Sequence, residues 1–160
     1  IGLDYYFKEP IRDIQQKVFI EQMELAKKLD KPIIIHDRDA HEDILATLKK
    51  YRLPGVVHRF SGNAQMALEL VKLGMYLGLG GAITFYSVRK TAEIIRQIPL
   101  DHFLIETDCP YAAPVPLKDQ RCDSSMLSYV CQKIADIKGI SVDEVIAVTN
   151  RNAKNLYRMH

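Results

Sequence analysis

The sequence predicts an α/β fold built on a parallel β-sheet, because short apolar runs alternate with longer amphipathic segments along all 160 residues. The runs are rich in β-branched or aromatic residues, which is typical of parallel strands buried on both faces. Two architectures fit this alternation, an open doubly wound sheet and an α/β barrel. No linker or low-complexity tract interrupts the pattern, so residues 1–160 are expected to form a single domain.

The strands are expected where the apolar runs lie. The first residues resemble the inside of a strand, so we expect the chain to start in mid-fold, and Asp4 ends that run. The remaining strands are predicted at 33–35, 56–57, 75–78 and 103–105.

Helices are predicted between these runs, where apolar residues recur at helical spacing. Pro10 suits a first helical turn, Ser87 suits an N-cap, Gly139 suits a helix end, and Ser141 with Glu144 forms a capping box. The apolar positions that define the helices are Ile11, Ile14, Val18, Leu25 and Leu29; Ile44, Leu45 and Leu48; Ala64, Ala67, Leu68 and Val71; Val88, Thr91, Ala92 and Ile95; Met126, Val130, Ile134 and Ile137; and Val145 and Val148.

The composition is that of an ordinary globular protein, with 48% hydrophobic and 26% charged residues and a formal net charge of +2. No apolar stretch approaches the roughly 20 residues of a membrane-spanning helix, so no membrane association is expected. The charge balance argues neither for nor against nucleic acid. Cys109, Cys122 and Cys131 form no CxxC pair, and we expect free thiols in a reducing cytoplasm.

Several strand runs end at residues with metal-binding side chains. His36 follows the run at 33–35, His58 follows the run at 56–57, and Asp108 lies just beyond the run at 103–105. The carboxyl ends of parallel strands lie on one rim of the sheet, and in barrels that rim carries the active site. Two imidazoles and one carboxylate are a standard ligand set for a catalytic divalent ion. His41, His102 and His160 are interpreted as surface residues.

Motifs around these residues resemble those of the TatD family of metal-dependent hydrolases. Residues 34–40 read IIHDRDA and resemble the family's IHxRDA motif, and residues 57–62 read VHRFSG where the family has HCFSG. PLD at 99–101, ETDCPY at 106–111 and AP at 113–114 resemble the PLD…ETDxPYLAP signature. GLDY at 2–5 and NAKNLY at 152–157 are similar to the family's GEIGLDYY and NAxRLF segments.

The resemblance implies the last four to five βα units of a TIM-type (β/α)8 barrel, a metal-dependent hydrolase that cleaves phosphodiester bonds in DNA. It implies that His36, His58 and Asp108 bind metal and that Asp108 also acts as the general base. One or two divalent ions are implied, with zinc, manganese and magnesium as candidates; histidine ligands also permit iron, whereas magnesium prefers all-oxygen sites. Cationic side chains expected to contact the phosphates of a DNA substrate are Arg38, Arg59, Lys118 and Arg121.

The chain departs from the family pattern in ways that bear on activity. The family's HxH pair is absent and its bridging glutamate would directly precede Ile1. Arg59 replaces a cysteine, Gly80 replaces a serine, and the family's basic run after Pro116 is altered. We therefore expect either a polypeptide longer by on the order of 80 to 100 residues or an open sheet edge that pairs with another copy. The 160-residue chain alone is expected to have little or no nuclease activity.

Two alternative functions stay open at the level of sequence. A related amidohydrolase-type enzyme acting on a small amide, ester or lactone could use the same ligands, because fold and ligands do not fix the substrate. A truncated, inactive barrel kept as a binding module is the non-enzymatic alternative. The sequence does not fix the oligomeric state, the cleavage polarity or the preference between DNA and RNA.

Overall fold

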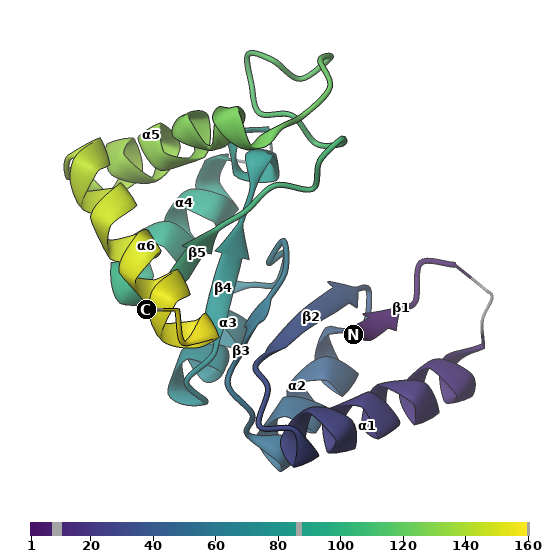
Figure 1. Cartoon of the computed structure of the whole chain (residues 1–160). Coiled ribbons are helices and arrows are strands. Elements are labelled where there is room, and N and C mark those ends of the chain that lie inside the picture. The colour runs from purple at the N-terminus through teal and green to yellow at the C-terminus, as the bar shows by residue number, and fades with distance from the viewer. Residues whose placement is uncertain (8–10, 86–87, 160) are drawn as a thin grey trace.

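The computed structural model describes residues 1–7, 11–85 and 88–159 and contains a five-stranded parallel sheet (Figure 1). The predicted strand positions are confirmed, and neighbouring strands along the chain are also neighbours in the sheet, in the order β1-β2-β3-β4-β5. The strands are β1 (Gly2–Asp4), β2 (Ile33–Arg38), β3 (Gly55–Val57), β4 (Tyr76–Leu79) and β5 (Phe103–Ile105).

This strand order decides between the two architectures that the sequence left open. A doubly wound sheet reverses its strand order at a switch point, and helices then cover both faces. Here the order never reverses, and each crossover returns the chain to the next position along the sheet. The sheet is therefore of the TIM-barrel type, and the prediction of a partial barrel is confirmed.

The predicted helices are also present, with short 3₁₀ turns between some of them. Asn63 caps the helix that begins at Ala64 by accepting from the Met66 backbone N–H at 2.8 Å, and the Ser141 hydroxyl caps the last helix by accepting from the Glu144 N–H at 3.1 Å. Gly139 ends its helix in the left-handed conformation, with φ 69°. The helices are α1 (Arg12–Lys28), α2 (His41–Tyr51), α3 (Ala64–Lys72), α4 (Val88–Gln97), α5 (Leu127–Lys138) and α6 (Val142–Tyr157), and the 3₁₀ turns are η1 (Gly81–Thr84), η2 (Leu100–His102) and η3 (Ser124–Met126).

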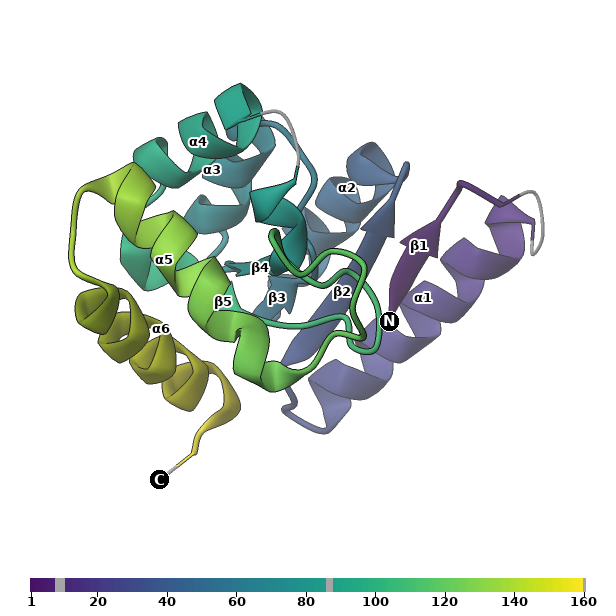
Figure 2. The same cartoon turned by 90° about the horizontal axis from the view of Figure 1, so that it is seen from above.

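The main core lies between one face of the sheet and the helices that follow the strands (Figure 2). The largest side chains fully buried there include Phe19, Met23, Leu48, Leu70 and Phe103. Burying side chains of this size removes roughly 1.5–3 kcal/mol of unfavourable hydration each, which makes this layer the main source of stability.

The opposite face of the sheet is only partly covered. Helix α6 reaches over it, and Leu156 packs against Val56 and Leu104 in a small second cluster. Ile34 points to the same side and is 50% exposed, so β2 is buried on one face only. The expectation that these strands are buried on both faces is therefore wrong for β2.

Helix α1 forms as predicted, but a different face of it packs on the sheet. The buried side chains are Phe19 and Met23, whereas the apolar residues used to recognise the helix are about half exposed. Those exposed residues are Ile11, Ile14, Val18, Leu25 and Leu29. Apolar spacing therefore identified the helix but not its buried side, because Phe19 and Met23, on another face of the helix, fill the core instead.

Two predicted helix starts, at Pro10 and Ser87, lie outside the described residues. Among the helices of the described part of the chain, none is both long enough and apolar enough to cross a bilayer. Cys109 is exposed and Cys122 and Cys131 are buried, and all three are free thiols, as the sequence predicts.

Candidate metal centre

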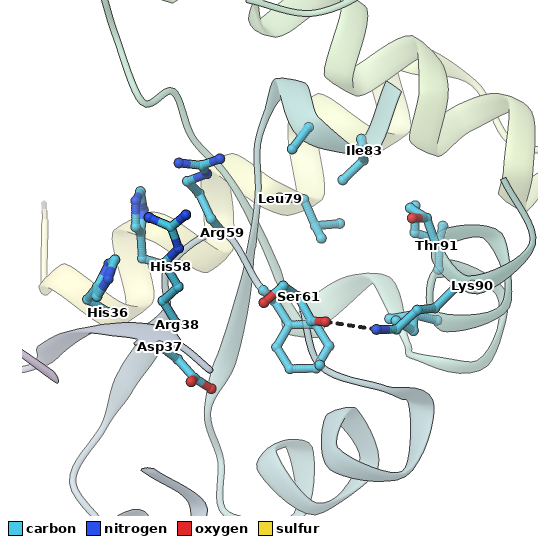
Figure 3. Close-up of a pocket in the computed structure, with 15 residues that line it drawn as sticks. His36, Asp37, Arg38, His58, Arg59, Ser61, Leu79, Ile83, Lys90 and Thr91 are labelled. Carbon is cyan, nitrogen blue, oxygen red and sulfur yellow. Dashed lines mark hydrogen bonds between the residues drawn. The ribbon is translucent and has the colours of Figure 1, made fainter. Parts of the chain in front are cut away.

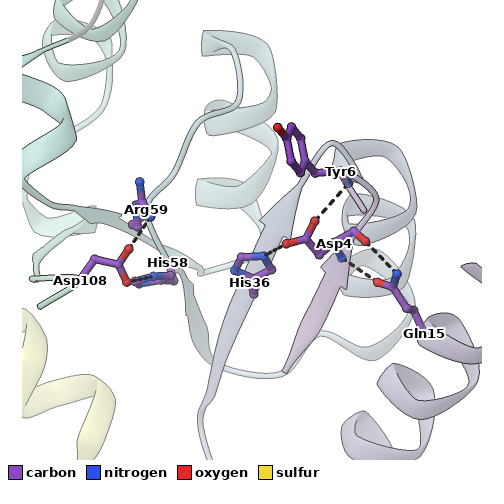
Figure 4. Close-up of polar contacts among 7 residues, drawn as sticks. All are labelled: Asp4, Tyr6, Gln15, His36, His58, Arg59 and Asp108. Atoms are coloured by element: carbon purple, nitrogen blue, oxygen red, sulfur yellow. Dashed lines mark hydrogen bonds and ion pairs between the residues drawn. The ribbon is translucent and has the colours of Figure 1, made fainter. Parts of the chain in front are cut away.

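Polar side chains form a row along the carboxyl ends of the strands (Figure 4). Asp4 ends β1, His36 lies near the end of β2, His58 follows β3, and Asp108 lies beyond β5. Ile35 pairs with Val57 in the register of β2 and β3, and the His58 N–H donates to the Ile35 carbonyl at 2.8 Å. The two histidines therefore directly follow paired positions on neighbouring strands. Neighbouring strands in a sheet are about 4.8 Å apart.

His58 is held between two carboxylates from the same segment. Its Nδ1 lies 3.0 Å from Oε1 of Glu106, and its Nε2 lies 3.5 Å from Oδ1 of Asp108. The hydrogen bond with Glu106 raises the pKa of His58, an effect that burial opposes and that the charge of Asp108 reinforces. The imidazole is 22% exposed, so its contacts are shielded from water but open at one side.

Glycine in strand β4 makes room for the Glu106 side chain. A Cβ atom at Gly78 would lie 2.7 Å from the Glu106 Cδ and both carboxylate oxygens, closer than real Cβ contacts allow. The carboxylate thus rests directly on the β4 backbone, within reach of His58 and of the Arg59 N–H, which donates to Oε1. Any larger residue at position 78 would push Glu106 away from this position.

Arg59 turns back toward the site at the end of β3. Its backbone adopts a left-handed conformation with φ 47°, which ends the strand and redirects the chain. The guanidinium then donates to Oδ2 of Asp108. The carboxylate of Asp108 therefore contacts both His58 and Arg59.

His36 has a carboxylate partner on the other side of the row. Its Nε2 lies 3.0 Å from Oδ2 of Asp4, while Oδ1 of Asp4 accepts from the Tyr6 N–H at 3.1 Å. Gln15 on α1 fixes the Asp4 backbone through both of its amide atoms, at 2.7 and 2.8 Å. From β1 to β5 the row thus consists of a carboxylate, two imidazoles and a second carboxylate.

Of the three predicted ligands, the structure brings His58 and Asp108 into contact, whereas His36 is paired with a different carboxylate. His58 contacts Asp108, while His36 contacts Asp4, which the sequence analysis did not assign to the site. Within the described residues, no three His, Cys, Asp or Glu side chains are grouped as a set that could hold a metal ion. Glu106 was also missed, although it lies two residues before Asp108 and therefore on the same side of an extended segment. Asp4 was missed although it follows an apolar run, as His36 and His58 do.

The donor chemistry at His58 fits a metal ligand. If Nδ1–H donates to Glu106, a neutral His58 keeps its Nε2 lone pair free on the side of Asp108. Metal-binding histidines use this arrangement, in which a carboxylate behind the ring fixes the tautomer and the orientation. Two donor atoms 3.5 Å apart are also close to the separation of two ligands around one ion, each about 2.0–2.2 Å from it.

A cavity of about 430 Å³ opens beside the row (Figure 3). Its polar side includes His36, His58 and two of the predicted phosphate contacts, Arg38 and Arg59. Lys90 on α4 also borders it and donates to the Ser61 carbonyl at 3.0 Å. Apolar walls come from Phe60, Leu79, Ile83, Ile94 and Ile95.

The other two predicted phosphate contacts lie elsewhere. Lys118 and Arg121 are exposed in the segment between β5 and α5, and neither is among the described residues that line this cavity. The Lys118 ammonium lies 5.8 Å from the centre of the Phe85 ring. Of the three histidines interpreted as surface residues, His41 and His102 are half-buried rather than exposed, and His160 lies outside the described residues. His41 contacts the buried carboxylate of Asp37 at 2.7 Å.

Comparison with known proteins identifies the family. The model of the family described as TatD related DNase matches residues 1–158. The chain belongs to this family.

Relatives in the TatD family support the same conclusion. The chain is 41% identical to the Bacillus subtilis protein "Uncharacterized metal-dependent hydrolase YabD" over 163 residues, covering 100% of the chain and 64% of that protein. It is 38% identical to "Putative deoxyribonuclease tatdn3" of Danio rerio, covering 98% of the chain and 59% of that protein. The chain thus spans about six tenths of the length of these relatives.

A solved structure from the same family has the same fold. The crystal structure of YjjV, a TatD homologue from Escherichia coli K12, superposes with a TM-score of 0.91 at 33% identity. The match covers 100% of this chain and 62% of YjjV. The TatD-type fold expected from the motifs is therefore confirmed.

Proposed function

We propose that this chain contributes the carboxyl-terminal strands of a metal-dependent hydrolase that cleaves phosphodiester bonds in DNA. The observation that carries the proposal is the setting of His58, whose two ring nitrogens face Glu106 and Asp108 at the carboxyl rim of a parallel sheet. The family's description as TatD related DNase and the deoxyribonuclease name of the zebrafish relative support DNA as the substrate.

We assign His36, His58 and Asp108 as ligands of one or two divalent ions, zinc, manganese or magnesium. The names of the bacterial relatives support a metal-dependent reaction without naming the ion. When bound, a divalent ion supplies positive charge that neutralises phosphate oxygens and acidifies water.

The protein groups have separate tasks in this proposal. Glu106 holds the His58 ring through Nδ1, so that Nε2 faces the site. Asp108 accepts the proton of the attacking water as general base, which requires an ionised carboxylate. Arg59 already donates to Asp108, and this contact orients the carboxylate at the site.

Substrate phosphates would meet the cationic side of the cavity. Arg38 and Arg59 border the cavity together with both histidines, so a phosphate near the row would be within reach of a guanidinium. Lys118 and Arg121 are exposed and are proposed to contact phosphates farther along the strand. We also propose a cytoplasmic location, which the three free thiols support.

The decisive experiment measures metal content and hydrolysis in the same preparations of the intact protein. We expect stoichiometric divalent metal and metal-dependent release of nucleotides from single-stranded DNA. His58→Ala is expected to lose metal and to slow hydrolysis by about 100-fold or more, because a direct ligand matters at least as much as the groups behind it.

His102→Ala provides the matched control, because His102 is also half-buried but precedes β5 at the opposite rim. It is expected to keep both metal and activity. Metal-dependent cleavage of a small amide, ester or lactone without cleavage of DNA would contradict the proposed substrate. Unchanged hydrolysis in His58→Ala would contradict the proposed centre.

A further inference from the structure

Two aromatic side chains are exposed immediately after β1. Tyr6 is 59% exposed and Phe7 is 58% exposed. Their rings meet nearly at right angles, with centroids 4.9 Å apart and an interplanar angle of 86°. Large aromatic side chains usually gain more stability from burial, so an exposed and mutually packed pair indicates a surface that contacts a ligand.

A guanidinium lies against this aromatic pair. The Arg38 Cζ atom is 3.7 Å from the centre of the Tyr6 ring and 5.6 Å from that of Phe7. The contact is a cation–π interaction, and it holds a positive charge beside the exposed rings. Tyr6, Phe7 and Arg38 therefore form a small cationic aromatic surface, here called the aromatic platform.

The aromatic platform is directly connected to the candidate metal centre. The Tyr6 N–H donates to one oxygen of Asp4, whose other oxygen contacts His36 (Figure 4). Arg38 lies two residues after His36 in β2 and borders the same cavity as His58. A polymer whose phosphate lies at the row of imidazoles would have its neighbouring unit close to the aromatic platform.

We propose that the aromatic platform stacks an unpaired nucleobase of single-stranded DNA. The proposal rests on the proposed function, since it takes DNA as the substrate. Aromatic rings and guanidinium planes accept the face of any base, and the positive charge of Arg38 attracts the adjoining phosphate. In a duplex the base faces are stacked on one another, so the aromatic platform selects strands with unpaired bases.

The test compares two probes that carry the same phosphates. One is a short oligothymidylate, and the other is an abasic oligonucleotide of equal length. Binding to the intact protein is measured in a chelator, so that no cleavage occurs. We expect the native protein to bind oligothymidylate about tenfold or more tightly than the abasic strand, as loss of a stacked base predicts. The double variant Tyr6→Ala/Phe7→Ala is expected to lose this preference and to keep its affinity for the abasic strand.

Two controls separate stacking from damage to the fold. Tyr6→Phe keeps the ring and is expected to bind as the native protein does. Tyr129→Ala removes an exposed aromatic residue from α5 and is expected to change neither affinity. Thermal unfolding of each variant verifies that it is folded.

The outcomes also separate this inference from the proposed function. Equal affinity of the native protein for the two probes, or an unchanged preference in the double variant, overturns the stacking inference. Failure of the intact protein to cleave DNA with any divalent metal overturns the proposed function. A base preference that is lost in the double variant supports the stacking inference whatever the cleavage assay gives.

Discussion

Replacing Gly78 with alanine is expected to disturb the candidate metal centre while leaving the fold intact. The added Cβ would lie 2.7 Å from the Glu106 carboxylate, whereas ordinary contacts begin at 3.4 Å. Glu106 must then move by about 0.7 Å, and we expect this shift to lengthen and weaken its 3.0 Å contact with His58 Nδ1. The backbone is not strained, so we expect the free energy of unfolding to change by about 1 kcal/mol or less.

Two measurements report the displacement of the Glu106 carboxylate. In the metal-free protein, NMR titration should show a lower pKa for His58, because the Glu106 hydrogen bond is the main cause of its raised pKa. Metal affinity should fall by about 10- to 100-fold, the usual effect of losing the group behind a histidine ligand. The resonance that disappears in the His58→Ala variant identifies the NMR signal of His58.

A double-mutant cycle isolates the proposed route. In a Glu106→Gln background, Gly78→Ala should cause little further change in the pKa of His58, because the contact is already weakened. A native pKa and native metal affinity in the Gly78→Ala single variant would refute the reasoning. An equal decrease in both backgrounds would show that Gly78 acts on His58 by another route.

Three further predictions concern stability. Asn152→Ala should destabilise the protein by about 2–4 kcal/mol in urea unfolding, because its buried amide donates to the Leu100 and Phe103 carbonyls at 3.1 and 2.8 Å; a loss below 1 kcal/mol would contradict this. Ser141→Ala should cost about 1 kcal/mol through loss of the α6 cap, with Ser141→Asn as the conservative control. The raised pKa of His58 stabilises the metal-free fold fully below about pH 6.5, and this contribution should disappear as pH rises through the folded pKa. Unfolding of native and His58→Gln protein in chelator, compared across that range, should therefore converge at high pH.

The sequence predicted the strands and the rim residues well because both depend on local order along the chain. Residue His36 ends an apolar run and His58 ends the next, and parallel pairing then places them side by side. Apolar periodicity and helix-ending residues such as Gly139 were enough to predict which segments are helices and which are strands. Motif resemblance added the barrel, and the unreversed strand order agrees with it.

The sequence did not predict contacts that depend on side-chain packing. Nothing in the spacing of α1 shows that Phe19 and Met23, rather than Ile14 and Leu25, face the sheet. Likewise, the position of Glu106 depends on an absent side chain at Gly78, which lies on the preceding strand, 28 residues earlier in the chain. Such details follow from how volumes fit together, which a one-dimensional pattern does not contain.

The row of carboxylates and imidazoles has the same order in space as in the sequence. The register of β1 with β2 and of β2 with β3 fixes Asp4, His36 and His58, and α2, which connects β2 to β3, contributes no member of the row. Lengthening α2 by a turn, or inserting residues in the loop before β3, would therefore leave His36 and His58 facing the same neighbours. Helix α2 is thus free to diversify, for example toward new binding partners, while the chemistry at the rim stays unchanged.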